Sequence, residues 1–173
     1  TTFAGTMASP GIVNATGTAA KFNRPCGLAI DAQDNIYVAD ASNNVVRKTT
    51  PAGVVSTFAG AGTAGSANGA ATTATFNSPT DVAITPAGVM YVADQVNHVI
   101  RKIDAGQVTT IAGLAGTLGN VNGTGSAARF NQPSWVTLAP DGTLLIRDGA
   151  NSGNIRKLDP ATGVVTSFAA GTA

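Results

Sequence analysis

Glutamate is absent from this sequence, and all nine acidic residues among its 173 are aspartates. Only 11% of the residues are charged and the formal net charge is +1, so no long-range field attracts nucleic acid or an anionic membrane. Helical bundles and coiled coils need glutamate, lysine and leucine at helical spacing, and this composition excludes them. Because 43% of the residues are nevertheless hydrophobic, a disordered chain is excluded as well.

Cysteine and long apolar runs are equally scarce. The single cysteine, Cys26, cannot form a disulfide within the chain. The longest strongly apolar run is Leu144-Leu145-Ile146, far below the ~18 residues that cross a bilayer, so we expect no membrane partner. Abundant threonine, serine and asparagine favour an extracellular or cell-surface location. Because the chain opens with Thr-Thr-Phe, we expect that any targeting segment was removed or never included.

What the sequence does contain is a unit of 54 residues that occurs three times. Phe-Asn-x-Pro stands at residues 22–25, 76–79 and 130–133. A second motif ends in Asp40, Asp94 and Asp148, and an Arg-Lys pair follows each of these aspartates. In the third copy the pair comes one residue later than the spacing of 54 gives, because of a shift at Ser152-Gly153. We expect one domain over 1–173, with repeats over about 1–55, 56–108 and 109–165 and an extra outer strand at 166–173.

Apolar residues alternate with a period of two within each repeat, which predicts strands. In the first repeat the strands are expected at 27–31, 36–40, 45–48 and 54–58. Turn residues such as Asp141-Gly142 join successive strands as hairpins. Four antiparallel strands form a small twisted sheet, and such sheets stack radially in a β-propeller. We therefore predict an all-β propeller with four-stranded antiparallel blades, three to the chain.

The same motifs resemble the NHL repeat, in the variant with a long loop of glycine, alanine and asparagine before Phe-Asn-x-Pro. The resemblance rests on a proline followed by a Val-Ala-Ile-Asp-like strand, then Tyr-Val-Ala-Asp, Asn-x-Val-Ile-Arg-Lys and Thr-Thr-x-Ala-Gly, and it covers essentially the whole chain. It implies a closed ring, most often of six blades. Three blades cannot close, and they leave apolar outer faces uncovered. We expect a homodimer that closes a six-bladed ring about a twofold axis; the alternative is a fragment of a longer chain or an engineered half-propeller.

The outer-strand motif occurs once more than the ring needs, at residues 1–5 and again at 164–170. We expect the C-terminal copy to pair within its own chain, because the turn at 160–163 leads directly into it. Residues 1–5 are then dispensable for the dimer.

Three aspartates that recur once per repeat, Asp40, Asp94 and Asp148, suggest a metal ring around the axis. Each precedes an arginine of the next strand (Arg47, Arg101 or Arg156) by seven or eight residues, so we favour a cross-strand pair or a turn cap. The glycines at 60–65 fit a dinucleotide-binding pattern, but no helix follows them, which favours a surface loop.

The sequence shows no recognisable set of catalytic residues. His98 is the only histidine, and one imidazole per chain falls short of a typical metal site, so we interpret it as an exposed turn residue. Cys26 has no histidine beside it in the sequence and is interpreted as a small buried residue. We expect no catalytic residue, no metal and no cofactor.

The repeats differ most where the long loop enters the innermost strand, near one mouth of the central channel. Asp81 and Trp135 replace a glycine there, and Arg147 replaces an alanine. An aromatic surface with a few polar groups at a concave mouth favours a small glycan or peptide. The predicted ligand site consists of Arg24, Ser78, Asp81, Gln132, Trp135 and Arg147. The alternative is drift among the repeats, with Trp135 filling core space.

These features together predict a non-catalytic binding or scaffold module that assembles with itself. The resemblance also implies alternatives, namely a metal-dependent lyase or hydrolase and an RNA-binding propeller. RNA binding would need a basic face, and Lys21, Arg24 and Arg129 are too few for one, so we expect no nucleic-acid partner.

Overall fold

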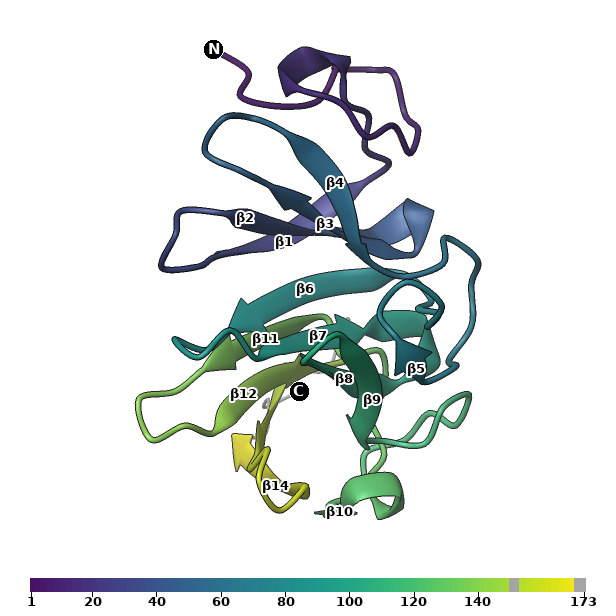
Figure 1. Cartoon of the computed structure of the whole chain (residues 1–173). Coiled ribbons are helices and arrows are strands. Elements are labelled where there is room, and N and C mark those ends of the chain that lie inside the picture. Colours follow the sequence, from purple (N-terminus) through teal and green to yellow (C-terminus); the bar gives the residue numbers. More distant parts are fainter. Residues whose placement is uncertain (150–152, 170–173) are drawn as a thin grey trace.

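Three antiparallel sheets follow one another along the chain and stack face to face in the computed structural model (Figure 1). The structure describes residues 1–149 and 153–169, so Ser152 and residue 170 lie outside it. We call the sheets blades 1, 2 and 3. No helix among the described residues is long and apolar enough to span a bilayer.

Each blade is a meander whose strands pair in chain order. Blade 1 contains β1 (Pro25–Ile30), β2 (Ile36–Asp40), β3 (Val45–Thr49) and β4 (Val55–Ala59). Blade 2 contains β6 (Pro79–Ile84), β7 (Met90–Asp94), β8 (Val99–Asp104) and β9 (Gln107–Ala112). Blade 3 contains β11 (Trp135–Leu138), β12 (Leu144–Asp148), β13 (Asn154–Leu158) and β14 (Val164–Ala169). The predicted all-β class and meander order are confirmed.

The prediction of four strands per blade is correct only for blade 1. The long loop adds β5 (Gly69–Ala70) beside β9 and β10 (Gly123–Thr124) beside β14, so blades 2 and 3 have five strands. In blade 1 the same place holds a single bridge between Thr16 and Val54. The loops also contain 3₁₀ turns at η1 (Gly17–Ala19) and η4 (Gly125–Ala127), and the turns after β2 and β7 contain η2 (Ala41–Asn43) and η3 (Gln95–Asn97). The extra pairing gives hydrogen-bond partners to an outer edge that would otherwise be open.

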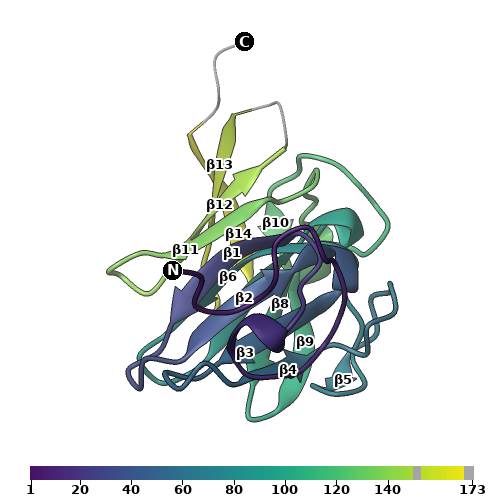
Figure 2. The same ribbon diagram turned by 90° about the horizontal axis from the view of Figure 1, so that it is seen from above.

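Two hydrophobic cores hold the blades together. The core between blades 1 and 2 contains Tyr37 and Phe76, and the core between blades 2 and 3 contains Tyr91 and Phe130 at the equivalent positions. Both phenylalanines are fully buried. The inner strand β6 contacts both β1 and β11 at the inner edge of the stack, which Figure 2 shows from above. Each internal junction is thus built from the same two halves.

Blades 1 and 3 each leave one face uncovered, as predicted. On blade 1 this face carries Leu28, Ile30, Ile36 and Val38, and on blade 3 it carries Trp135, Leu145, Ile155 and Phe168. Leu28 is 59% exposed, whereas its equivalents Val82 and Val136 in the internal junctions are 3% and 2% exposed. Phe168 is likewise 59% exposed. We call these the uncovered face of blade 1 and the uncovered face of blade 3.

Both copies of the outer-strand motif have a place in the structure. β14 pairs with β13 within the chain, which confirms the prediction for the C-terminal copy. Residues 1–5 lie against blade 1 on the side away from blade 2 (Figure 1). There the Gly5 N–H donates to the Gly17 carbonyl at 3.1 Å, as the Gly113 N–H at the end of β9 donates to Gly125. Residues 1–5 therefore occupy the place of a preceding blade's outer strand.

Candidate ligand-binding site at the channel mouth

The residue before each repeat proline adopts a left-handed backbone, with φ of 57° at Arg24, 54° at Ser78 and 58° at Gln132. The asparagine one position earlier donates its N–H to the aspartate that ends the second strand, at 2.7 to 2.8 Å in all three blades. This turn brings the long loop sharply into the innermost strand. The three residues therefore stand at the same end of β1, β6 and β11.

The recurring aspartates are committed to buried ion pairs. Asp40 contacts Arg47 at 3.1 Å, and Asp94 and Asp148 contact Arg101 and Arg156 at 2.9 Å. The structural interpretation of these aspartates is confirmed. Burial raises the pKa of Asp94 to about 6 and also raises that of Asp148, although hydrogen bonds and the arginine oppose the shift.

Each of these arginines also fastens the long loop to its blade, which the sequence reasoning missed. Its other guanidinium nitrogen donates to the side chain of Asn14, Asn68 or Asn122 at 2.7 to 3.0 Å. Its guanidinium carbon lies 5.0 to 5.4 Å from the ring centre of the repeat phenylalanine. The signal was available, because these asparagines recur at the repeat's own spacing of 54. The arrangement is structural, and no group of three metal-ligating side chains occurs within residues 1–149 and 153–169.

A side chain from the turn after the second strand reaches across each internal junction. The Asn44 side-chain oxygen accepts the Ser78 N–H at 2.9 Å, and His98 Nδ1 accepts the Gln132 N–H at 3.1 Å. We call this contact the junction latch. The interpretation of His98 as an exposed residue was wrong, since blade 3 covers it to 9% exposure. Burial lowers the pKa of His98, which keeps Nδ1 available as an acceptor.

Among the described residues of blade 3, the latch position carries no side chain. Gly153 occupies the position of Asn44 and His98, three residues before the arginine, and shares their left-handed backbone with φ of 62°. A blade that docked on the uncovered face of blade 3 would therefore receive no side-chain hydrogen bond from residue 153.

Asp81 lies where the three inner strands converge. It is 5% exposed, and its Oδ2 accepts the Val136 N–H of the next blade at 2.9 Å. A Cβ on Gly27 of the previous blade would come within 2.8 Å of the Asp81 Cα, which explains the glycine there. Burial raises the pKa of Asp81 to about 6, despite hydrogen bonds from Val136 and Val82 that lower it. Its carboxylate links strands and has little surface to offer a ligand.

The remaining predicted residues form two exposed groups along the rim. Arg24 donates to the Ser78 hydroxyl at 2.8 Å across the first junction. Trp135 and Arg147 are opposite each other on β11 and β12, and the indole is 60% exposed. In the single chain, Trp135 therefore does not fill core space. Arg147 also lies 3.5 Å from the Ser134 hydroxyl.

The six residues therefore line one rim without meeting in one cluster. Gln132 has an exposed side chain between the two groups, and its backbone is held by His98. Asp81 and Trp135 border an open cavity of about 270 Å³ along the inner strands. Cys26, interpreted as buried, is exposed, because no blade covers the strand face on which it lies. The rim offers an aromatic ring and two guanidinium groups.

Radially stacked four- and five-stranded meanders around three inner strands define a β-propeller protein. The chain contains the NHL repeat. The family model described as NHL repeat matches residues 22–48, which run from the first Phe-Asn-x-Pro motif through β3.

Relatives in other organisms share part of this sequence. Protein SUPPRESSOR OF QUENCHING 1, chloroplastic, of Arabidopsis thaliana is 34% identical over 152 residues, which is 83% of this chain and 14% of that protein. Teneurin-3 of Mus musculus is 32% identical over 155 residues, which is 76% of this chain and 6% of that protein. The chain thus spans a small part of the curated relatives that it matches.

Solved structures share the fold. A structural genomics protein of unknown function from Bacteroides thetaiotaomicron is 29% identical, with a TM-score of 0.67 over 72% of this chain and 32% of that one. A gluconolactonase from Xanthomonas campestris is 17% identical, with a TM-score of 0.60 over 86% of this chain and 48% of that one. The virginiamycin B lyase of Staphylococcus aureus is 15% identical, with a TM-score of 0.58 over 86% of this chain and 42% of that one. The last two likenesses concern the fold alone.

Proposed function

We propose that this chain is a non-catalytic, ring-forming binding module, in which two copies close one six-bladed propeller. One observation carries the proposal: the two uncovered faces are the two halves of the junction that the chain already builds twice. Leu28, Ile36 and Val38 hold the positions of residues buried in the core between blades 2 and 3. Two identical junctions would then bury both faces, as a twofold ring requires.

The opposite half of the junction is also present. Leu145, Ile155 and Phe168 on blade 3 hold the positions of Tyr91, Ile100 and Ile111, which pack against blade 3 from blade 2. Apolar side chains left in water on both faces supply a hydrophobic driving force for their contact. Blade 3 of one copy therefore fits blade 1 of the other.

Ring closure also completes the rim of the mouth. The indole of Trp135 and the guanidinium of Arg147 would stand next to Arg24 of the second copy, in the order that the internal junctions show. Two guanidinium groups beside an aromatic face favour a small glycan or peptide that carries a carboxylate. Isothermal titration with acidic glycan and peptide panels tests this site. Trp135→Ala should abolish the binding heat, and a signal unchanged by that substitution would contradict the site.

Sedimentation equilibrium tests the assembly. The expected mass is twice the chain's 17.1 kDa. Leu28→Asp places a charge on the uncovered face of blade 1 and should give monomers. Leu118→Asp is the matched control, because Leu118 is similarly exposed at 63% but lies on the long loop before blade 3. A wild-type monomer, or a Leu28→Asp dimer as tight as the wild type, would contradict the proposed assembly.

Two further expectations from the sequence stay predictions. A metal-dependent lyase or hydrolase is the alternative function, and a divalent metal found in the purified protein by elemental analysis would support it. The extracellular or cell-surface location is the other; the name of the Arabidopsis relative places that protein in the chloroplast.

A further inference from the structure

The outer part of the uncovered face of blade 1 is occupied by the chain's own N-terminal segment, residues 1–9. One backbone hydrogen bond, from Gly5 to Gly17, and the Thr6 hydroxyl, which donates to the Thr18 carbonyl, hold it in place. Phe3 remains 52% exposed and Met7 92% exposed. The segment therefore contacts blade 1 but is held there by few interactions.

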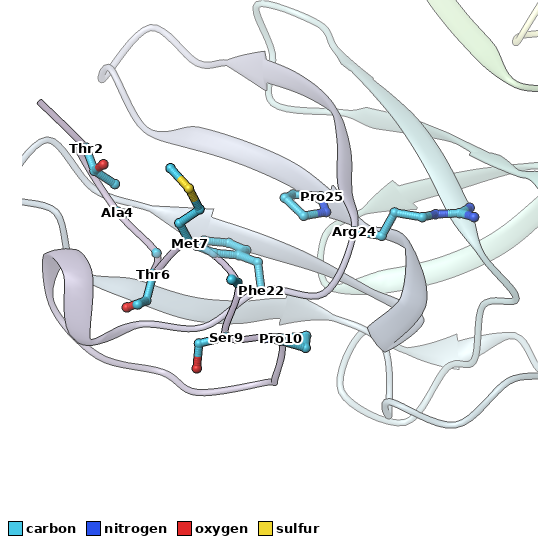
Figure 3. A pocket seen from close by; sticks show the side chains of 11 residues that line it. Thr2, Ala4, Thr6, Met7, Ser9, Pro10, Phe22, Arg24 and Pro25 are labelled. Atoms are coloured by element: carbon cyan, nitrogen blue, oxygen red, sulfur yellow. The ribbon is translucent and has the colours of Figure 1, made fainter.

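The contact leaves a cavity beneath the segment. Its volume is about 430 Å³, and Thr2 and residues 4–10 line it together with Phe22, Arg24 and Pro25. Figure 3 shows residues that line it, with the Arg24 side chain extending away from the N-terminal segment. Packing at this contact is loose compared with the closed cores between blades.

The place that this segment occupies is the place of an outer strand in a complete junction. A Cβ on Gly5 would come within 3.0 Å of the Phe22 ring, and a Cβ on Gly113 would come within 3.1 Å of the Phe130 ring. Phe3 is thus the positional counterpart of Ile111, the residue of β9 that packs against blade 3. The N-terminal segment thus imitates the end of β9 at the uncovered face of blade 1.

A second copy would bring its own outer strand to that place. β14 ends in a partial copy of the motif, in which Phe168 is the counterpart of Phe3. β14 is held by four residue pairs with β13 and by two more with β10. Two segments cannot occupy one place, and the segment held by one backbone hydrogen bond yields more readily than the strand held in a ladder.

We infer that the uncovered face of blade 1 is a docking surface for the third blade of a second copy, and that residues 1–9 are a displaceable cover over its outer part. The inference rests on the proposed function and makes it more specific, because assembly then requires the cover to leave. The cover shields apolar surface in the single chain, and its removal is a step in closing the ring.

Dilution measurements of the dimer dissociation constant by sedimentation test the inference. A chain lacking residues 1–9 should dimerise at least 10-fold more tightly than the full chain, a difference of about 1.4 kcal/mol. Phe3→Asp in the full chain should act in the same direction, because it weakens the cover without removing backbone. Met7→Asp is the matched control and should leave the dissociation constant unchanged, since Met7 is almost fully exposed.

Hydrogen exchange gives a second readout in the unmodified chain. The Gly5 amide should be protected at concentrations that favour monomers and lose its protection in the dimer. Equal dissociation constants for the full and shortened chains would overturn the cover alone. A weaker dimer from the shortened chain would overturn it as well, because residues 1–9 would then belong to the junction. If both chains are monomers, the docking surface and the proposed assembly both fail.

Discussion

Asp81 makes the stability of this protein depend on pH in a way that one substitution should remove. Burial raises its pKa from the ordinary value of 3.8 to about 6, so the folded protein favours the neutral carboxyl group. The stabilising contribution of Asp81 is therefore complete below about pH 3.8 and is lost as the pH rises through about 6. At pH 7.5 the buried carboxylate costs about 3 kcal/mol relative to the same group in water.

Asp81→Asn removes that cost, because the amide stays neutral and its oxygen can still accept the Val136 N–H. Urea denaturation should show the variant to be more stable than the wild type at pH 7.5, by up to about 3 kcal/mol. At pH 4 the difference should fall close to zero. Burial raises the pKa of Asp94 to about 6 as well, but Asp94 is present in both proteins and cancels in the comparison.

Asp141→Asn is a control of opposite sign. Hydrogen bonds from Thr143 and Lys157 lower the pKa of this exposed carboxyl group, so its contribution is present at neutral pH and is lost on acidification. The substitution should weaken the protein at pH 7.5 and matter less at low pH. The reasoning on Asp81 is refuted if Asp81→Asn is less stable than the wild type at pH 7.5, or if the difference is the same at pH 7.5 and pH 4.

Two glycine substitutions probe the junctions. Gly27→Ala should lower the unfolding free energy by about 2 kcal/mol in a urea titration, because its methyl group would lie 2.8 Å from the Asp81 Cα. Gly11→Ala is the control and should have little effect, because its methyl group would meet only a flexible lysine side chain. Equal losses from the two variants would contradict this steric account. Gly153→Asn should supply a latch to Arg24 of the second copy at each of the two junctions. Two hydrogen bonds of about 1 kcal/mol each should tighten the dimer about 30-fold, whereas Gly153→Ala should not tighten it.

The architecture could be predicted from the sequence because the same motifs recur at a fixed spacing. The strand predicted at 36–40 is β2 at the same residues, since alternation and turn residues mark both its ends. β5 was missed because Gly69-Ala70 carries no strand preference and pairs only where the loop runs beside β9. The local sequence pattern predicts a meander, whereas pairing at the edge of a sheet depends on which segment lies beside that edge.

Burial was harder to predict, because it depends on the neighbouring blade. His98 and Cys26 were each assigned the wrong environment, since one lies in a covered junction and the other on a face that no blade covers. The candidate site shows the same dependence. Asp81 lies near the start of the inner strand β6, where the long loop enters it, as predicted. Its hydrogen bond to Val136 of the next blade is a contact between repeats that the spacing within one repeat does not encode.

Disulfide trapping tests the central claim most directly, because it reports which two faces meet. In the internal junction Gly27 approaches Asp81 closely, so ring closure would place residue 135 of one copy beside Gly27 and the exposed Cys26 of the other. Trp135→Cys should therefore oxidise to a covalent dimer of twice 17.1 kDa on a non-reducing gel, while Leu118→Cys, placed on the long loop, should not. A Trp135→Cys chain that stays at the monomer mass, or that cross-links no better than Leu118→Cys, would contradict the closed ring.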